Sequence, residues 1–189
     1  MRSVVCFGDS NTWGSIPMAT HTDRRRYGFD QRWTGRLQAM LRADWRVIEE
    51  GLPGRTTLWD DPISGGHRSA LTYLRPCLES HVPFDVLIVM LGTNDFKRRF
   101  GLSAAEVAIG LDRILGETRT VVQGRQPQPD ILAVAPPAII ETGIFAEMFA
   151  GASAKSRALA PLLAEVARSN SAHFINADEQ VASSPLDGI

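Results

Sequence analysis

The chain has 189 residues, which suits a single domain with one hydrophobic core. Its 44% apolar and 22% charged residues are typical of globular proteins, and its net charge of −1 gives no electrostatic reason to expect nucleic acid as a partner. No apolar run approaches the ~20 residues of a membrane-spanning helix, and no signal segment precedes the first expected strand. We therefore expect a cytoplasmic protein that binds neither membranes nor nucleic acids.

Five short apolar runs alternate with segments of helical periodicity along the chain. The expected strands are residues 3–8, 45–49, 85–91, 131–135 and 173–176. The expected helices are residues 31–42, 71–80, 103–122 and 154–169. This alternation predicts a single α/β domain over residues 1–189, a three-layer αβα sandwich with a five-stranded parallel sheet, doubly wound as in flavodoxin-like proteins.

Two of the expected helices contain proline, which lacks the N–H group that a helical hydrogen bond needs. We expect Pro76 to lie in the first turn of its helix, and Pro161 either to kink its helix or to mark where it begins. Ser103 and Glu106 have the spacing of a capping box, which predicts the start of the third helix.

Two long segments between these elements are expected to serve a site or an interface. Residues 15–30 form a charged loop that is long for an α/β domain. Residues 138–152 form an apolar lid-like loop or short helix that lines a pocket or covers a subunit interface. The basic runs 24–26 and 97–99 are interpreted as solvated loops or contacts between subunits.

Cys6 and Cys77 are the two cysteines, and their spacing indicates neither a metal site nor a disulfide framework. Both lie in apolar segments, so we expect buried, reduced thiols and a reducing compartment. The sequence therefore predicts no metal and no cofactor.

Three polar loops follow expected strands, and each holds a residue suited to acyl transfer. Ser10 lies in the turn 8–14, Gly54 in the loop 50–57, and Asn94 just after the third expected strand. Alone, the turn 8–14 is compatible with a serine nucleophile, a phosphate-binding turn or a simple tight turn. Because the carboxyl ends of parallel strands meet at one edge of a sheet, we expect the three loops to converge.

Together these loops supply the parts of a serine hydrolase. Ser10 is the expected nucleophile, and its backbone N–H, the N–H of Gly54 and the side-chain amide of Asn94 are the expected oxyanion hole. Glycine at position 54 lets the backbone approach the substrate closely. Asn11 and Trp13 are assigned to the substrate pocket, with packing beneath the loop as the alternative for Trp13.

Three charged neighbours of these residues are given supporting roles. Asp9 is interpreted as a turn residue rather than a catalytic acid, and Asp95 as the anchor of the third loop. Arg55 is expected to pair with a loop carboxylate or to contact a neighbouring subunit.

The motifs Gly8-Asp9-Ser10, Gly54 and Gly92-Thr93-Asn94-Asp95 resemble those of the SGNH hydrolases, also called GDSL-type esterases. Longer strings within residues 4–100, such as Arg32-Trp33-Thr34-Gly35, are similar to the mycobacterial arylesterase–acyltransferase subgroup. The resemblance implies small acyl esters, notably acetyl esters, as substrates. It also implies a homo-oligomer, with an octamer as one form, in which loops from neighbours narrow the entrance to the site.

The last motif of that family is Asp-x-x-His, which supplies a base and the carboxylate that orients it. Asp187-Gly188-Ile189 matches its start, so the resemblance implies Asp187 as the orienting carboxylate. The sequence ends one residue before the expected histidine, and the family's terminal helix is not in it. Two interpretations stay open: the native protein continues with that histidine, or the chain is a truncated product. The four histidines of the sequence are interpreted as structural or solvated: His21, His67, His81 and His173.

The sequence thus predicts a serine esterase of small acyl esters, with acyl transfer to alcohols as a second activity. The same site would serve a carbohydrate deacetylase, a thioesterase or a lysophospholipase. A non-catalytic phosphate-binding module needs only the turn 8–14, and the loops at Gly54 and Asn94 weigh against it. A catalytically inactive oligomeric protein is the remaining hypothesis, which a true lack of the histidine would favour.

Overall fold

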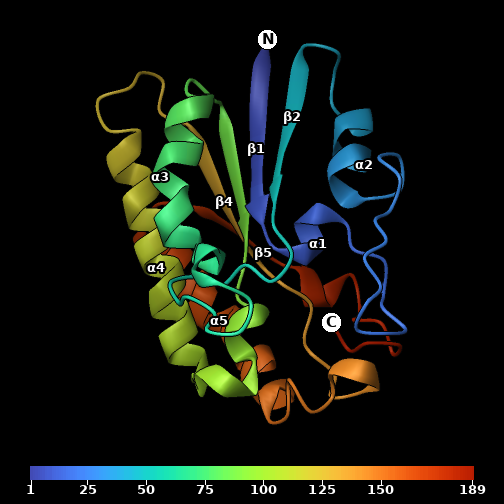
Figure 1. The fold of residues 1–189 in the computed structure, drawn as a ribbon. Coiled ribbons are helices and arrows are strands. Elements are labelled where there is room, and N and C mark those ends of the chain that lie inside the picture. The colour runs from blue at the N-terminus through green and yellow to red at the C-terminus, as the bar shows by residue number, and fades with distance from the viewer.

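The structure, a computed structural model, describes residues 1–189. Five parallel strands form one sheet in the order β2-β1-β3-β4-β5 (Figure 1). The strands are β1 (Arg2–Gly8), β2 (Trp45–Gly51), β3 (Val86–Met90), β4 (Asp130–Ala135) and β5 (His173–Asn176). All five expected strands are confirmed, and the order is that of a doubly wound sheet.

Helices lie on both faces of this sheet, which gives the expected three layers (Figure 1). The helices are α1 (Ser10–Trp13), α2 (Trp33–Met40), α3 (Ala70–His81), α4 (Ala104–Val121) and α5 (Ala152–Ser169). Helices α3, α4 and α5 pack side by side on one face, and α2 lies on the other. Short 3₁₀ turns, η1 (Gly66–Arg68), η2 (Asn94–Phe96), η3 (Arg98–Phe100), η4 (Gly143–Phe145) and η5 (Ala177–Glu179), interrupt the loops.

The two faces of the sheet are buried to very different extents. In β1, Val5 and Phe7 point towards α3–α5 and belong to a core of 28 buried residues. Val4 and Cys6 alternate with them and, with Ile88, form a cluster of three buried residues on the α2 face. Cys6 and Cys77 are both buried and free, as expected. The larger core therefore fixes the strand ends that carry the polar loops.

The expected helices are found within two residues of their expected bounds, but the two prolines do not lie where the sequence led us to expect them. Pro76 is the seventh residue of α3, not part of its first turn, and Pro161 lies well inside α5 and does not mark its start. Both prolines lie on exposed positions, where water can satisfy the carbonyl groups that lose an N–H partner. The capping box of α4 is confirmed, since Ser103 Oγ accepts from Glu106 N and Glu106 Oε2 accepts from Ser103 N.

The strand order reverses between β1 and β3, which are neighbours in the sheet although β2 separates them in sequence. Ligands of doubly wound proteins bind at such a reversal, beyond the carboxyl ends of the strands. The loops that follow β1, β2 and β3 meet there. No helix of the chain combines the length and the apolar character needed to cross a membrane.

Candidate active site

The loop after β1 is a tight helical turn that begins with the expected nucleophile. Ser10 is the first residue of α1, and Asp9 caps this helix by accepting from Asn11 N at 3.0 Å. Gly14 ends it in the left-handed conformation, with φ of +87°, and donates its N–H to the carbonyl of Ser10. The N–H groups at the start of a helix have no partner inside it, so this turn leaves donors beside the Ser10 hydroxyl.

Glycines let this turn pack directly against the neighbouring strand. A Cβ atom at Gly51, the last residue of β2, would collide with the backbone of Trp13. A Cβ atom at Gly8 would collide with the side chain of Thr12 and lie 2.7 Å from the carbonyl oxygen of Met90. Ser10 can therefore take its position only because residues 8 and 51 are glycines, which have no side chain.

The loop after β2 presents a free backbone donor. Gly54 adopts φ of +81°, a conformation that favours glycine, and its N–H forms no hydrogen bond within the protein. Arg55 holds this loop against β1, because its Nη1 donates to the carbonyls of Gly8, at 2.9 Å, and Glu50, at 2.5 Å. The expected role of Arg55 is corrected here. It is buried, stacks on Phe7 and binds backbone carbonyls rather than a carboxylate or a second subunit.

Asn94 ties the three loops together. Its Nδ2 donates to Asp9 Oδ2 at 3.2 Å and to the carbonyl of Arg55 at 3.1 Å. These contacts join the loop after β3 to the loops after β1 and β2. Both acceptors are oxygens, which fixes the orientation of the amide. An oxyanion that binds this amide must share or replace one of the two contacts.

Two buried carboxylates lie beneath these residues. Burial raises the pKa of Asp9 to about 6, although the Asn11 N–H and the charge of Arg55 oppose this shift. Burial also raises the pKa of Asp95 to about 7, against the hydrogen bonds that Thr57 donates from N and Oγ1. Asp95 thereby anchors the second loop to the third, as the sequence predicts for the third loop.

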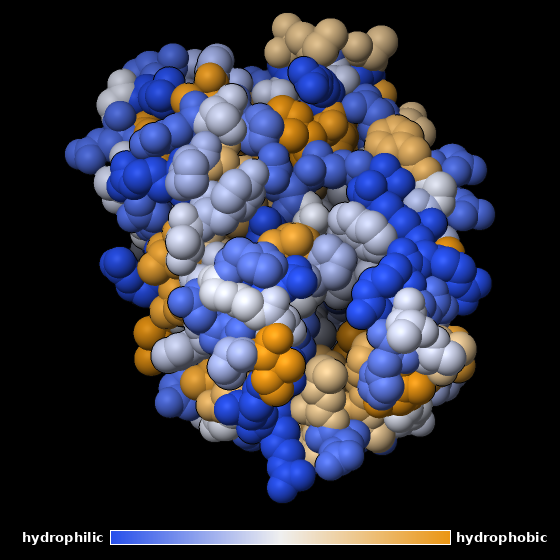
Figure 2. All heavy atoms as spheres, viewed as in Figure 1, coloured by the Kyte–Doolittle hydropathy of each residue, from blue (hydrophilic) through white to orange (hydrophobic).

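A cavity of about 680 Å³ opens at this edge of the sheet. Its walls include every residue that the sequence analysis assigned to the site: Ser10, Asn11, Trp13, Gly54, Asn94 and Asp187. In the space-filling view this region is hollowed and bordered by both hydrophilic and hydrophobic side chains (Figure 2). The three loops therefore converge on one cavity, as expected from the parallel topology, and the C-terminal segment reaches the same cavity.

Asp187 reaches the cavity from the C-terminal end of the chain. It is buried, its Oδ2 accepts from Met18 N at 2.7 Å, and its Oδ1 has no hydrogen-bond partner. The neighbouring Gly188 has φ of +85°, and its carbonyl accepts from Ile140 N. The structure thus holds the Asp187 carboxyl against the loop 15–30 and leaves one of its oxygens free to accept.

None of the four histidines forms a hydrogen bond with Ser10 or Asp187. His21 lines the cavity, with its ring 5.6 Å from that of Phe145, but it forms no hydrogen bond with Ser10 or Asp187. His81 Nε2 lies 2.7 Å from a carboxyl oxygen of Glu50, on another part of the surface. His67 lies in η1, and His173 is exposed at the start of β5.

Sequence reasoning missed the basic character of the cavity. Lys97 is buried and pairs with the buried Asp61, so interpreting 97–99 as a solvated run or subunit contact is wrong for this residue. Burial lowers the pKa of Lys97, and the Asp61 carboxylate opposes the shift. Arg99 shares the same carboxylate at 2.9 Å. Asp61 lies 36 residues before Lys97, so no local pattern could reveal the pair.

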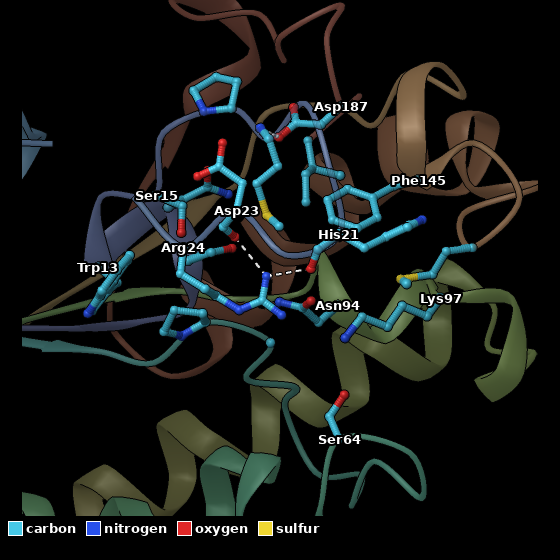
Figure 3. A pocket seen from close by; sticks show the side chains of 18 of the residues that line it. Trp13, Ser15, His21, Asp23, Arg24, Ser64, Asn94, Lys97, Phe145 and Asp187 are labelled. Atoms are coloured by element: carbon cyan, nitrogen blue, oxygen red, sulfur yellow. Dashed lines mark hydrogen bonds between the residues drawn. The ribbon is translucent and has the colours of Figure 1, made fainter. Parts of the chain in front are cut away.

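The segment 138–152 forms part of the cavity wall, which agrees with the expectation that it lines a pocket. It holds η4 and a series of turns rather than an α-helix. Phe145, Met148 and Phe149 line the cavity from this side. Phe145 lies on the side of the cavity opposite Trp13 and Ser15 (Figure 3).

The family model of the GDSL-like lipases and acylhydrolases matches residues 6–188. The chain belongs to this family. It is therefore an acyl-ester hydrolase, on an α/β fold that its structural relatives share. A comparison with curated proteins found no match.

Three solved structures of this family are similar over the whole chain. Est24, a carbohydrate acetylesterase from Sinorhizobium meliloti, is 40% identical, with a TM-score of 0.94 over 100% of this chain and 90% of its own. The aryl esterase of M. smegmatis is 36% identical, with a TM-score of 0.93 over 100% and 90%. A carbohydrate acetylesterase family member from Sinorhizobium meliloti is 36% identical, with a TM-score of 0.91 over 100% and 89%.

Proposed function

We propose that this GDSL-family hydrolase is a serine esterase that cleaves small acyl esters, notably acetyl esters, through an acyl-enzyme on Ser10. One observation carries the proposal: Ser10, Gly54 and Asn94 come from three separate loops and line one cavity. The free N–H of Gly54 and the first N–H of α1 supply backbone donors for an oxyanion, and the Asn94 amide supplies a third. No metal or cofactor is needed for this chemistry.

In this mechanism the Ser10 oxygen attacks the carbonyl carbon of the ester while its proton passes to an imidazole. The imidazolium then protonates the departing alcohol as the carbon–oxygen bond breaks, and water repeats the sequence to release the acid. In the family pattern the imidazole lies three residues after Asp187, and Ile189 is the last residue described. The free Oδ1 of Asp187 can accept a hydrogen bond from an N–H of that imidazole, and this bond would orient the ring.

The Asn94 contacts suggest how the third donor becomes available. Asp9 accepts one N–H of the amide, and burial already disfavours the charge of Asp9. A negative oxygen that develops at the substrate competes with Asp9 for this N–H. The amide is held in place before the reaction, so its donation costs little reorganisation.

The similar structures support two substrate groups. The aryl esterase supports aryl esters as substrates, and Est24 supports acetylated carbohydrates. The rim of the cavity favours a polar alcohol, because Ser64, Asp23 and Arg24 line it with hydroxyl, carboxylate and guanidinium groups. We therefore propose deacetylation of carbohydrates as the second candidate activity. Acyl transfer to alcohols and a homo-oligomer such as an octamer remain part of the proposal, on the arylesterase–acyltransferase resemblance.

The decisive experiment measures hydrolysis of p-nitrophenyl esters by the protein as its gene encodes it, from acetate to decanoate. We expect the highest kcat/KM with acetate, and a loss of at least about 10³-fold in Ser10→Ala, since removal of a nucleophile leaves only binding and oxyanion stabilisation. A fluorophosphonate should add its mass to the peptide that contains Ser10.

Ser80→Ala is the matched control, because its hydroxyl lies on α3 and binds only the carbonyl of Cys77. It should keep the activity of the wild type. Unchanged turnover in Ser10→Ala would contradict the proposed mechanism.

A further inference from the structure

The cavity carries more positive than negative side chains, although the whole chain has a net charge of −1. Its cationic wall is Arg24, Arg25, Arg68, Lys97 and Arg99. Asp23 and Asp187 are the carboxylates that line it, and Asp61 lies directly behind Lys97. The excess of positive charge is thus local to the site and not a property of the protein surface as a whole.

Some of these cations are neutralised by neighbours. Arg25 pairs with Asp23 at 2.7 Å, and Lys97 and Arg99 share the single carboxylate of Asp61. Two cations on one carboxylate leave a net positive charge at that side of the cavity. The remaining two, Arg24 and Arg68, have no carboxylate within 4.0 Å.

Arg68 lies beside the expected oxyanion donor. Its Nε is 3.6 Å from the position that a Cβ atom would take on Gly54, and its Nη1 donates to the carbonyl of Pro53 at 2.5 Å. The Nε is buried and has no hydrogen-bond partner. A guanidinium has five N–H donors in a planar arrangement, and one carbonyl satisfies only a small part of them.

Arg24 enters the same cavity from the loop 15–30. Its Nη1 donates to the carbonyls of His21 and Asp23, each at 2.7 Å, which holds the guanidinium in the cavity (Figure 3). These acceptors are neutral, so the charge of Arg24 stays uncompensated. A carboxylate binds a guanidinium through two parallel hydrogen bonds that neither carbonyl can offer.

We propose that the ester hydrolysed at this site carries a carboxylate, which binds Arg68 and Arg24 while its ester carbonyl lies at Gly54. The proposal rests on the proposed function and narrows its substrate class to acidic esters. The carboxylate belongs either to the acyl group, as in a dicarboxylic acid monoester, or to the alcohol, as in an acetylated acidic sugar. Both place a negative group a few atoms from the scissile bond.

Two matched ester pairs test the proposal and separate these sources. For the alcohol side, 4-acetoxybenzoate is compared with neutral 4-acetoxybenzamide. For the acyl side, monoethyl succinate is compared with neutral ethyl succinamate, whose poor leaving group keeps spontaneous hydrolysis low. Hydrolysis is followed by pH-stat titration with the protein as its gene encodes it, in the wild type and in Arg68→Gln, Arg68→Lys and Arg24→Gln.

We expect the wild type to prefer the acidic member of at least one pair. The ratio of kcat/KM for the acidic over the neutral ester should fall about 10- to 100-fold in Arg68→Gln, the effect of losing one hydrogen bond to a charged group. It should fall less in Arg68→Lys, which keeps the charge, and in Arg24→Gln, whose arginine is exposed. Arg36→Gln is the control, because Arg36 is exposed on α2 and does not line this cavity, and its ratio should not change.

The outcomes separate the two proposals. Activity without a preference for the acidic ester in either pair contradicts the inference alone, as does a preference that persists in both Arg68→Gln and Arg24→Gln. Inactivity on all four esters contradicts the inference, and it contradicts the proposed function as well only if p-nitrophenyl acetate is not hydrolysed either. If Arg68→Gln does not fold, inhibition of the wild type gives the same test. 4-Hydroxybenzoate is compared with 4-hydroxybenzamide for the alcohol side, and succinate with succinamate for the acyl side. Binding of the more acidic member no tighter than that of its amide in both pairs would overturn the proposal.

Discussion

The cavity has an inner wall and an outer wall, and they are held in place by different means. The inner wall contains Ser10, Gly54 and Asn94, and hydrogen bonds from Asn94 to the buried Asp9 and Arg55 behind it join the three loops. The outer wall is the loop 15–30, whose charged residues are mostly exposed. Its Arg24 and Arg25 bind carbonyl or carboxylate groups only one to three residues away.

This difference fits the functions of the two walls, which are oxyanion stabilisation for the inner wall and substrate selection for the outer wall. Oxyanion stabilisation requires hydrogen-bond donors that are fixed before the reaction, because such donors stabilise the transition state without a cost for reorienting them. Long-range hydrogen bonds over the 28-residue core provide that rigidity. Substrate selection needs charge and polarity at the entrance, which a surface loop can supply without a core. We therefore expect substitutions at the inner wall to change catalysis or stability strongly, and substitutions in the loop 15–30 to have smaller effects on stability.

The largest effect is expected at Asn94. Asn94→Ala should lower kcat about 10²- to 10³-fold with little change in KM, because the lost donor acts on charge that develops in the transition state. Steady-state kinetics with p-nitrophenyl acetate measures it. Asn170→Ala, which removes an amide that binds Asp112 at the far end of α5, should leave kcat unchanged. A rise in KM alone would mean that the amide binds the ground state instead.

A smaller effect, on stability, is expected at Asp95. Its folded pKa of about 7 lies above the ordinary value, so the folded state favours the protonated form. This contribution to stability is complete below about pH 4 and is lost as the pH rises through 7. Asp95→Asn keeps an oxygen to accept from Thr57 but removes the titration. Between pH 5 and 8 the free energy of unfolding should then fall about 1 to 3 kcal/mol less than in the wild type.

Urea unfolding at several pH values measures this difference. Some slope should remain, because Asp9, with a pKa of about 6, acts in the same direction. The control in the outer wall is Asp23→Asn, since Arg25 lowers the pKa of Asp23 to about 2 and the group stays ionised throughout this range. An Asp95→Asn profile parallel to that of the wild type would show that Asp95 does not titrate between pH 5 and 8.

The smallest effect is expected at Arg25. Arg25→Gln breaks an exposed ion pair with Asp23, and exposed pairs contribute little to stability. The melting temperature should change by less than about 2 °C in thermal unfolding followed by circular dichroism. A larger loss would mean that the outer wall is held as firmly as the inner one, and the distinction between them would fail.

Much of the inner wall could be predicted because its parts lie at the ends of strands. Ser10, Gly54 and Asn94 each follow an apolar run, and parallel topology brings such ends together whatever the spacing in sequence. Asp187 was identified through a family motif and not through any local pattern. The fold was predictable for the same reason, since alternating strands and helices leave few arrangements of the sheet.

The outer wall and the supporting charges could not be predicted because their partners are distant. Arg55 binds the carbonyl of Gly8, 47 residues away, and a single arginine in a loop gives no sign of that. Lys97 belongs to a basic run that, in isolation, indicates solvent exposure, and only the fold brings Asp61 beside it. The length of the loop 15–30 did indicate a site, but not which of its residues would face it.

The glycines beneath the nucleophile have a practical consequence for altering this enzyme. Any side chain at Gly8 or Gly51 would collide with the turn that carries Ser10, so these two positions should stay constant in a mutant library. Diversity belongs instead in the loop 15–30 and around Phe145, where side chains line the cavity without carrying the turn. Selection for activity on new esters can then change the residues that bind the substrate, while the Ser10 hydroxyl keeps its position.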